Sequence, residues 1–552
     1  MNTRRNLAWL FLVVTVASVV CNSAGLCGFF KQVSWDVCNW KERGFCGNGA
    51  YADDFRELAE RYVLTDEPIY YCASANDGVL SPAERAIHLT LAWARVPCPV
   101  RYGTSEGYGD ASAIMTSRFS CTEFQGYRAV AENGSARLWL RDDIPIRRQT
   151  KNDACHESSS IQEFLGAALT CLIMVVTVFV LRKRSANKGC LSVAGSCAVV
   201  FFILTSAIAL THTLLAPTGL GVYAGKAKML YSVGGIPEGF FADAAYSSFQ
   251  PAYPPGFALL TLLAYLTSGL CGEWSVQILA TAAFSLALYI GMDEAGKSGR
   301  LAQLWVLAMF LTPNVFLMAT MYYAEGLMSL VIMIGFGRLC DKPTSIRGWL
   351  LLGLAGLVKN EGIALAFAIW LVQAVCNLER GNVNRFRIFR TCALKWAECL
   401  AVAIGPSLAW HVFARTQGGE FYDYAPIWHP NPSRFCEALH YIVTVAFLHP
   451  WKFGFAYPTA LIAFLAAAWK RIRHGRRCFG NMDGLIVGGV ALASLPVFAM
   501  IFSYSMVPDF EWHLRTSVER LLWCPSALVP LFLRVQRNAL LSAKSTDLQI
   551  GE

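Results

Sequence analysis

Residues 348–367 read GWLLLGLAGLVKNEGIALAF, an apolar stretch interrupted only by Lys359, Asn360 and Glu361. A charge within a membrane span costs roughly 2.5–3.5 kcal/mol on insertion scales, so ionisable residues in such a position usually line a pocket or a pathway. If the chain turns at Lys359, residues 348–358 fall short of the roughly 20 residues that a span requires. We therefore expect broken or tilted helices here, which a bilayer tolerates only where protein or a water-filled cavity surrounds the backbone.

The rest of the chain has the same apolar character. Of its 552 residues, 55% are hydrophobic and only 15% are charged, and the mean hydropathy is +0.41. Segments of this composition are too apolar to remain in water, so the sequence predicts an all-α polytopic membrane protein. We expect about ten to twelve transmembrane helices, with 255–272 as either a crossing or a re-entrant helix.

The net charge of +9 is distributed as in a membrane protein and does not indicate a nucleic-acid partner. Basic residues form short runs between apolar segments, which is the pattern of cytoplasmic loops under the positive-inside rule. These runs lie at 182–188, 297–300, 338–347, 380–390, 470–477 and 534–537. The turns between them then face outward, together with the four polar clusters at 226–243, 322–325, 359–361 and 512–517.

Composition divides the chain into four parts. Residues 1–27, basic and then apolar, are interpreted as a signal anchor or first transmembrane span, although a signal peptide fits as well. Residues 28–160 are predicted to form an extracytoplasmic Cys-containing α/β module, residues 161–535 the membrane domain and residues 536–552 a cytoplasmic tail. Within the module, Asn133-Gly134-Ser135 is a glycosylation sequon, but Asn-Gly is also a common hairpin turn, which we favour.

Two groups stand out among the 19 cysteines. Those within apolar stretches are expected to pack as small hydrophobic side chains: Cys171, Cys197, Cys271, Cys376 and Cys399. Those in the polar region form an even set, compatible with two or three disulfides if that region lies outside the cytoplasm: Cys38, Cys46, Cys72, Cys98, Cys121 and Cys155. No CxxC pair occurs, so we expect no zinc site. We also expect no other metal and no cofactor.

The first polar cluster contains Lys226, Lys228 and Asp243. Asp243 is the most credible carboxylate for accepting a proton from a hydroxyl nucleophile, with Glu238 second, although both also suit a solvated loop. Paired prolines after Tyr253 can open a helix but not continue one, so an external loop is expected to re-enter the membrane there.

The two central clusters combine acids, a base and aromatic side chains. Lys359 beside Glu361, after the small residues Gly353 and Gly356, fits a pocket better than a snorkelling lysine, and such a lysine suits a phosphate. Glu325, which follows Tyr322 and Tyr323, is either a second catalytic carboxylate or part of a hydrogen-bonded interface.

The last cluster runs from Trp512 through His513 and Arg515 to Arg520. On a helix that starts here, His513, Ser517 and Arg520 share one face. Histidine and arginine at a membrane edge suit a lipid-linked phosphate or, alternatively, anionic headgroups.

These clusters, in this order, resemble those of GT-C class multi-pass glycosyltransferases related to the dolichyl-phosphate-mannose protein mannosyltransferases. The resemblance covers about residues 195–535 and rests on the ordered set of motifs, since no single motif is decisive. The motifs are Tyr223 to Lys228, Gly234 to Pro237, Pro251 to Pro254, Tyr322 to Glu325, Val358 to Gly362 and Trp512 to Arg520.

The resemblance implies transfer of one sugar, with inversion, from a polyprenyl- or dolichyl-phosphate donor on the extracytoplasmic face. The acceptor would be a glycan, lipid or protein. Localisation would be the plasma (inner) membrane, or the endoplasmic reticulum membrane in a eukaryote. Asp243 and Glu325 would be catalytic, and the substrate would contact Lys226, Lys228, Tyr253, Tyr323, Lys359, Asn360, Glu361, Trp512, His513, Arg515 and Arg520.

Two positions depart from the family pattern. The aspartate expected a few residues before Lys226 is absent from 217–221, and glutamate at position 325 replaces an aspartate. The alternative functions are a multi-pass transporter or lipid-linked sugar flippase, or a non-catalytic scaffold whose outer module binds a partner. Transporters commonly contain internal repeats with sites near the midplane, and this sequence has no evident repeat.

Overall fold

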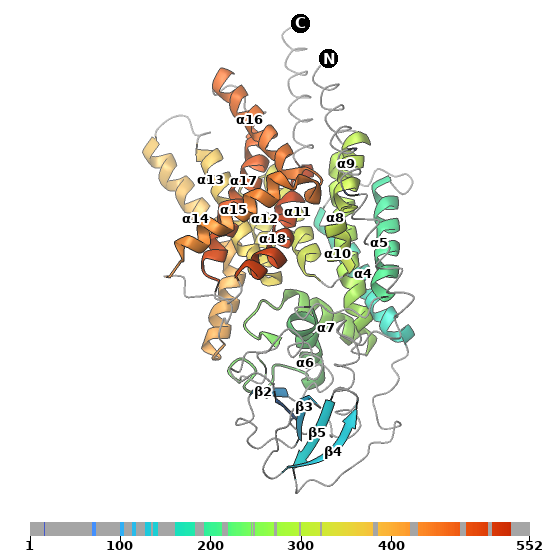
Figure 1. The fold of residues 1–552 in the computed structure, drawn as a ribbon. Helices are drawn as coiled ribbons and strands as arrows, with labels where there is room; N and C mark the ends of the chain where they lie inside the picture. The colour runs from blue at the N-terminus through green and yellow to red at the C-terminus, as the bar shows by residue number, and fades with distance from the viewer. Residues whose placement is uncertain are drawn as a thin grey trace.

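The computed structural model is mostly helical (Figure 1). It describes Val16, Asn22, the five strands given below, and then residues 160–182, 193–211, 219–243, 246, 249–269, 273–296, 300–320, 323–378, 385–419, 429–474, 482–505 and 510–531. In Figure 1 the sheet lies at one end of the molecule and the larger helical bundle at the other, with α6 and α7 between them.

Fifteen α-helices are described, with a π-helical turn at Gly219–Gly225 and a 3₁₀ turn at Pro450–Phe453. The first part of the bundle contains α4 (Ser160–Arg182), α5 (Val193–Thr211), α6 (Lys226–Val233), α7 (Gly256–Ser268), α8 (Glu273–Gly296), α9 (Arg300–Phe310) and α10 (Pro313–Thr320). The second part contains α11 (Glu325–Asp341), α12 (Ile346–Val358), α13 (Glu361–Leu378), α14 (Arg385–Thr416), α15 (Pro432–Leu448), α16 (Ala456–His474), α17 (Met482–Ser503) and α18 (Phe510–Ser526).

A small sheet precedes the helices in the sequence. Its five strands have the order β2-β1-β3-β5-β4, and they are β1 (Ile69–Cys72), β2 (Val100–Gly103), β3 (Ala113–Ser117), β4 (Tyr127–Asn133) and β5 (Ala136–Arg141). Strands β4 and β5 are antiparallel, and Asn133 pairs with Ala136. The predicted hairpin is therefore confirmed.

Four of the described helices are long and apolar enough to cross a membrane, or five if the bent pair α9 and α10 forms one span. The four contain residues 193–210, 275–296, 394–416 and 485–503. Several further helices are apolar but shorter. Helix α7, with 13 residues, is about 20 Å long and cannot cross a hydrocarbon core of about 30 Å as a straight helix.

The predicted break at Lys359 is confirmed. Helix α12 ends at Val358 and α13 begins at Glu361, which leaves two residues between two apolar helices. Small residues allow α12 to approach α14, because a Cβ atom on Gly353 would lie 2.8 Å from the Val402 carbonyl oxygen. A Cβ atom on Gly356 would clash with the Ser407 side chain. The break is thus held between closely packed helices, as a polar interruption requires.

The basic loops and the polar break lie at opposite ends of the same helices. Helix α11 runs from Glu325 to Asp341, α12 returns from Ile346 to Val358, and α13 leads from Glu361 to Leu378. The basic residues around 338–347 therefore lie a helix length away from Glu325 and Lys359. This arrangement is the one that the charge pattern predicts.

The thiols of Cys171, Cys197, Cys376 and Cys399 are free, as expected for packed side chains. Five of the six cysteines in the predicted disulfide set, and Cys271, lie outside the described residues. Cys72 lies in β1, but the structure describes only its backbone. The disulfide prediction therefore stays a prediction.

Candidate functional site

Four charged side chains from three separate segments meet at one end of the bundle. Glu325 begins α11, Lys359 and Glu361 flank the break between α12 and α13, and Arg520 lies on α18. Lys359 Nζ donates to Glu325 Oε1 at 2.8 Å and lies 3.4 Å from Glu361 Oε1. The Arg520 guanidinium lies 3.8 Å from the same oxygen of Glu325. We call these four residues the charge cluster.

The charge cluster is buried and electrically balanced. The side chain of Glu325 is fully inaccessible, and those of Lys359 and Glu361 are 6% and 10% exposed. Arg520 is somewhat more accessible, at 19%. Two cations face two carboxylates, so each charge is compensated where water is largely excluded. Buried ion pairs gain little net stability, because desolvation offsets most of their attraction. Stability alone is therefore a weak explanation for this cluster.

Three oxygen atoms at the cluster are buried without a hydrogen-bond partner among the described residues. They are Glu325 Oε2, Glu361 Oε2 and Asn360 Oδ1. Buried polar groups are normally satisfied, and an unsatisfied acceptor is costly. Unpaired acceptors at one place in a native fold indicate a ligand or water that carries donors.

Three tyrosines border the charge cluster. The Arg520 guanidinium lies over the ring of Tyr323, 4.7 Å from its centroid. Tyr223 is buried, interacts electrostatically with Lys359, Glu325 and Glu361, and shares a hydrogen bond with Tyr253. Burial raises the pKa of the Tyr223 hydroxyl well above its usual value, so this group remains a proton donor at neutral pH.

Lys226 lies at the start of α6, and its ammonium group binds the backbone of the 250–253 turn. Its Nζ donates to the carbonyl oxygens of Gln250, Pro251 and Tyr253 at 3.0, 3.4 and 2.7 Å. Burial lowers the pKa of Lys226 to about 7, whereas the three carbonyl acceptors favour its charged form. All three donors of the ammonium are used within the protein, so Lys226 holds the turn that carries Tyr253. Its predicted contact with the substrate stays a prediction.

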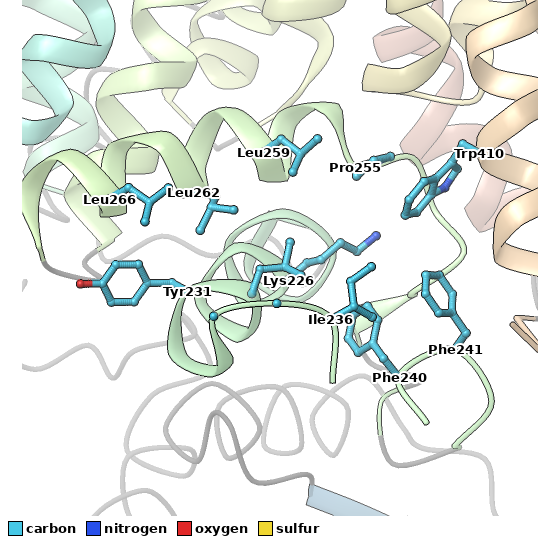
Figure 2. Close-up of a pocket in the computed structure, with 13 residues that line it drawn as sticks. Lys226, Tyr231, Ile236, Phe240, Phe241, Pro255, Leu259, Leu262, Leu266 and Trp410 are labelled. Carbon is cyan, nitrogen blue, oxygen red and sulfur yellow. The ribbon is translucent and has the colours of Figure 1, made fainter. Parts of the chain in front are cut away.

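A cavity of about 300 Å³ lies between α6 and α7 (Figure 2). Its lining is mainly apolar and includes Leu259, Leu262, Leu266, Phe240, Phe241 and Trp410. Figure 2 shows the Lys226 side chain extending past Ile236 toward the Trp410 side of this cavity. Leu259 and Leu266 are at least half exposed, so the cavity opens at the protein surface.

A contact at the start of α7 links the wall of the cavity to α12, the helix that ends beside Lys359. Pro255 lines the cavity, and the next residue, Gly256, packs against the last turn of α12. A Cβ atom on Gly256 would lie 2.7 Å from the Leu357 carbonyl oxygen, so only glycine permits this approach. Leu357 is two residues before Lys359. The contact between Gly256 and Leu357 therefore connects the segment that lines the cavity with the segment that carries Lys359.

The other predicted residues of α18 lie apart from the charge cluster. His513 Nδ1 and Ser505 Oγ are 2.8 Å apart, Arg515 pairs with Glu511, and Trp512 is 54% exposed. Arg520 Nη2 bonds Ser517 Oγ at 3.3 Å, so these two residues share a face as predicted. The structure thus brings Arg520 to the cluster and directs His513 toward the end of α17.

Asp243, the predicted base, lies in the loop after α6. Its backbone bonds Gly239 and Tyr246, and the neighbouring Phe241 packs against Trp410 and Phe413 of α14. Asp243 is half-buried, as is Lys228 on α6. Phe241 thus ties this loop to α14, whereas Glu325 and Glu361 lie at the starts of α11 and α13.

Two contributors to the site, Tyr223 and Trp410, are absent from the predicted site residues. Tyr223 was part of a motif without being a predicted site residue, and nothing marked its hydroxyl as a neighbour of Lys359. Trp410 lies inside an apolar helix, yet its Nε1 donates to the Ala252 carbonyl oxygen at 3.0 Å and fixes the 250–253 turn from outside. Tyr322, by contrast, lies outside the described residues.

The described residues contain no group of three or more side chains suited to hold a metal ion. Comparison of the chain with protein-family models, with curated proteins and with solved structures gave no match.

Proposed function

We propose that this protein is a membrane glycosyltransferase. It transfers one sugar, with inversion, from a polyprenyl- or dolichyl-phosphate donor to a glycan, lipid or protein acceptor on the extracytoplasmic face. The observation that carries the proposal is the convergence of Glu325, Lys359, Glu361 and Arg520 in one buried cluster. Glycosyl transfer from a lipid phosphate needs a base and cations at one place, and the cluster supplies both.

The charge balance of the cluster suits the course of this reaction. A carboxylate accepts the proton of the acceptor hydroxyl, whose oxygen then bonds the anomeric carbon. The bond from that carbon to the phosphate oxygen breaks, and the electron pair leaves with the lipid phosphate. Protonation removes one negative charge from the cluster as the phosphate gains one, so Lys359 and Arg520 are then free to attract the departing anion.

Glu361 takes the role of base in this proposal, in place of Asp243. Its carboxylate is slightly accessible, whereas that of Glu325 is fully enclosed. Glu361 also holds Lys359 less closely, at 3.4 Å against 2.8 Å for Glu325. Glu325 then fixes the position of Lys359, and Glu361 faces the acceptor.

The apolar cavity beside α7 supports a lipid-linked donor. Its mainly apolar lining offers an environment for part of an isoprenoid chain, and Gly256, next to the lining residue Pro255, contacts α12 two residues before Lys359. A water-soluble nucleotide sugar would gain little from such a surface.

Membranes that contain the full chain and a radiolabelled polyprenyl-phosphate sugar test the proposal. We expect label to enter a glycan, lipid or protein fraction, and Glu361→Gln to lower the rate by about 100-fold or more. Glu437→Gln, which alters an exposed carboxylate on α15, is the matched control and should transfer at the normal rate.

Two results would contradict the enzyme. Movement of the labelled lipid across the membrane without transfer would support a flippase or transporter. Normal function in both Glu361→Gln and Lys359→Met would support a scaffold whose outer module binds a partner.

A further inference from the structure

We infer that the unpaired acceptor oxygens of the charge cluster bind the hydroxyl groups of a neutral sugar and select against sugars that carry a carboxylate. The inference rests on the proposed function and assigns the substrate class to the same site. Its residues are Glu325, Asn360 and Glu361, whose oxygens Oε2, Oδ1 and Oε2 are buried and have no partner among the described residues.

The three oxygens belong to one small region. Both carboxylates direct their Oε1 atoms to the same ammonium, that of Lys359. The Oε2 atoms of these two carboxylates therefore belong to groups that are close to each other. Asn360 lies between Lys359 and Glu361 in the chain, so its side chain belongs to the same region. Glu325 and Glu361 are 0% and 8% exposed as whole residues, so bulk water does not freely solvate them.

All three atoms are acceptors, which restricts the ligand. They require N–H or O–H donors or a positive charge. A metal ion is disfavoured because the Lys359 ammonium already occupies the position between the two carboxylates, with Arg520 alongside. At these three atoms an anionic group is disfavoured, because it would face acceptor oxygens. A neutral polyhydroxylated group remains.

The surrounding side chains suit the rest of a sugar ring. Tyr223 and Tyr253 meet edge to face, with ring centroids 6.1 Å apart, and Tyr323 lies under Arg520. Aromatic rings offer apolar faces to the C–H groups of a pyranose, and buried tyrosine hydroxyls add directional hydrogen bonds. Acceptor oxygens beside aromatic rings therefore match both kinds of surface on a neutral hexose.

A pair of sugars that differ at one carbon separates this inference from general lipid binding. Glucose and glucuronic acid share the same ring, but the second carries a carboxylate where the first has a hydroxymethyl group. Equilibrium binding of farnesyl phosphate, farnesyl-phosphate glucose and farnesyl-phosphate glucuronic acid to the purified full chain is measured by thermophoresis. We expect the glucose conjugate to bind about tenfold or more tightly than the glucuronic acid conjugate.

Two variants identify the residues responsible. Glu361→Gln keeps the shape of the side chain but removes its charge, so the preference for glucose over glucuronic acid should fall to about threefold or less. Asn360→Leu removes one acceptor without changing charge. It should weaken the glucose conjugate by about fivefold or more and leave bare farnesyl phosphate unchanged. Glu437→Gln should preserve the wild-type ratio.

The outcomes distinguish this inference from the proposed function. Equal binding of the glucose conjugate and bare farnesyl phosphate would overturn the hydroxyl site while leaving a lipid-phosphate enzyme possible. Equal or tighter binding of the glucuronic acid conjugate would overturn the selectivity. Absence of binding by all three ligands, to a protein that elutes as a single species in size-exclusion chromatography, would overturn both.

Discussion

Lys359 pairs with two buried carboxylates, those of Glu325 and Glu361. Among the described residues, no other cation lies as close to either carboxylate. Replacing it with methionine retains the length of the side chain but leaves Glu325 and Glu361 facing each other without the ammonium between them. Breaking a buried ion pair by removing one partner typically costs about 3–5 kcal/mol. We expect Lys359→Met to lower the free energy of unfolding by about 3 kcal/mol, measured by denaturant unfolding in detergent micelles.

A second substitution checks that charge, and not packing, causes this loss. Glu325→Gln in the Lys359→Met background removes one of the stranded charges and should recover about 1 kcal/mol or more. If the two substitutions instead add their separate costs, Lys359 and Glu325 are not coupled and the charge cluster has been misidentified.

Lys226 gives a prediction about pH. Burial lowers its pKa from 10.5 to about 7, so between these values the unfolded chain binds more protons than the folded one. The contribution of this group therefore makes the free energy of unfolding rise with pH from about 7 to about 10.5, with no further change below 7. Lys226→Met should remove this component, seen as a smaller difference in unfolding free energy between pH 7 and pH 9.5. An identical pH dependence in the variant and the wild type would contradict the role of Lys226.

The charged residues of the site could be predicted from the sequence, but their pairing could not. Lys359, Glu361 and Glu325 stand out because ionisable groups are rare in apolar segments. Arg520 stands out as part of the polar cluster before the last apolar run. Which carboxylate meets which cation depends on helix packing, since Lys359 and Glu325 are 34 positions apart. Lys226 shows the limit of such reasoning, because three backbone carbonyls from a distant turn satisfy it and carbonyls leave no signal in the sequence.

At the scale of the element, the junction of α12 and α14 positions the break. A Cβ atom on Gly356 would clash with the Ser407 side chain, so a larger residue must push the two helices apart. We expect Gly356→Val to lower the free energy of unfolding by about 1–3 kcal/mol through overpacking and to reduce transfer in the membrane assay, because Lys359 follows three residues later. Gly337→Ala on α11 is the control, since a Cβ atom there meets no atom within 4 Å.

The same junction shows why elements are easier to predict than their lengths. The break at Lys359 follows from local chemistry, because a charge and an amide cannot continue an apolar span without a cavity. The end of α7 at Ser268, by contrast, coincides with Gly269 at φ 72°, a backbone conformation that an apolar run of residues does not reveal. The sequence therefore left 255–272 open between a crossing and a re-entrant helix.

If Gly356→Val unfolds no more easily than Gly337→Ala, the close packing of α12 on α14 does not hold the break.

For the whole molecule, the proposal requires that the charge cluster and the basic loops lie on opposite sides of the membrane. Thr516 on α18 and Lys342 at the end of α11 are exposed and mark the two ends. With Thr516→Cys and Lys342→Cys, a membrane-impermeant maleimide applied to intact cells should label position 516 and leave position 342 unlabelled until the cells are opened. Peptide-level mass spectrometry separates these thiols from the native cysteines. Labelling of position 342 alone would place the cluster on the cytoplasmic face, where an extracytoplasmic lipid-linked donor cannot reach it. Labelling of both positions in intact cells would show that the two ends do not lie on opposite sides of the membrane. With either result, the proposed enzyme would have to be abandoned.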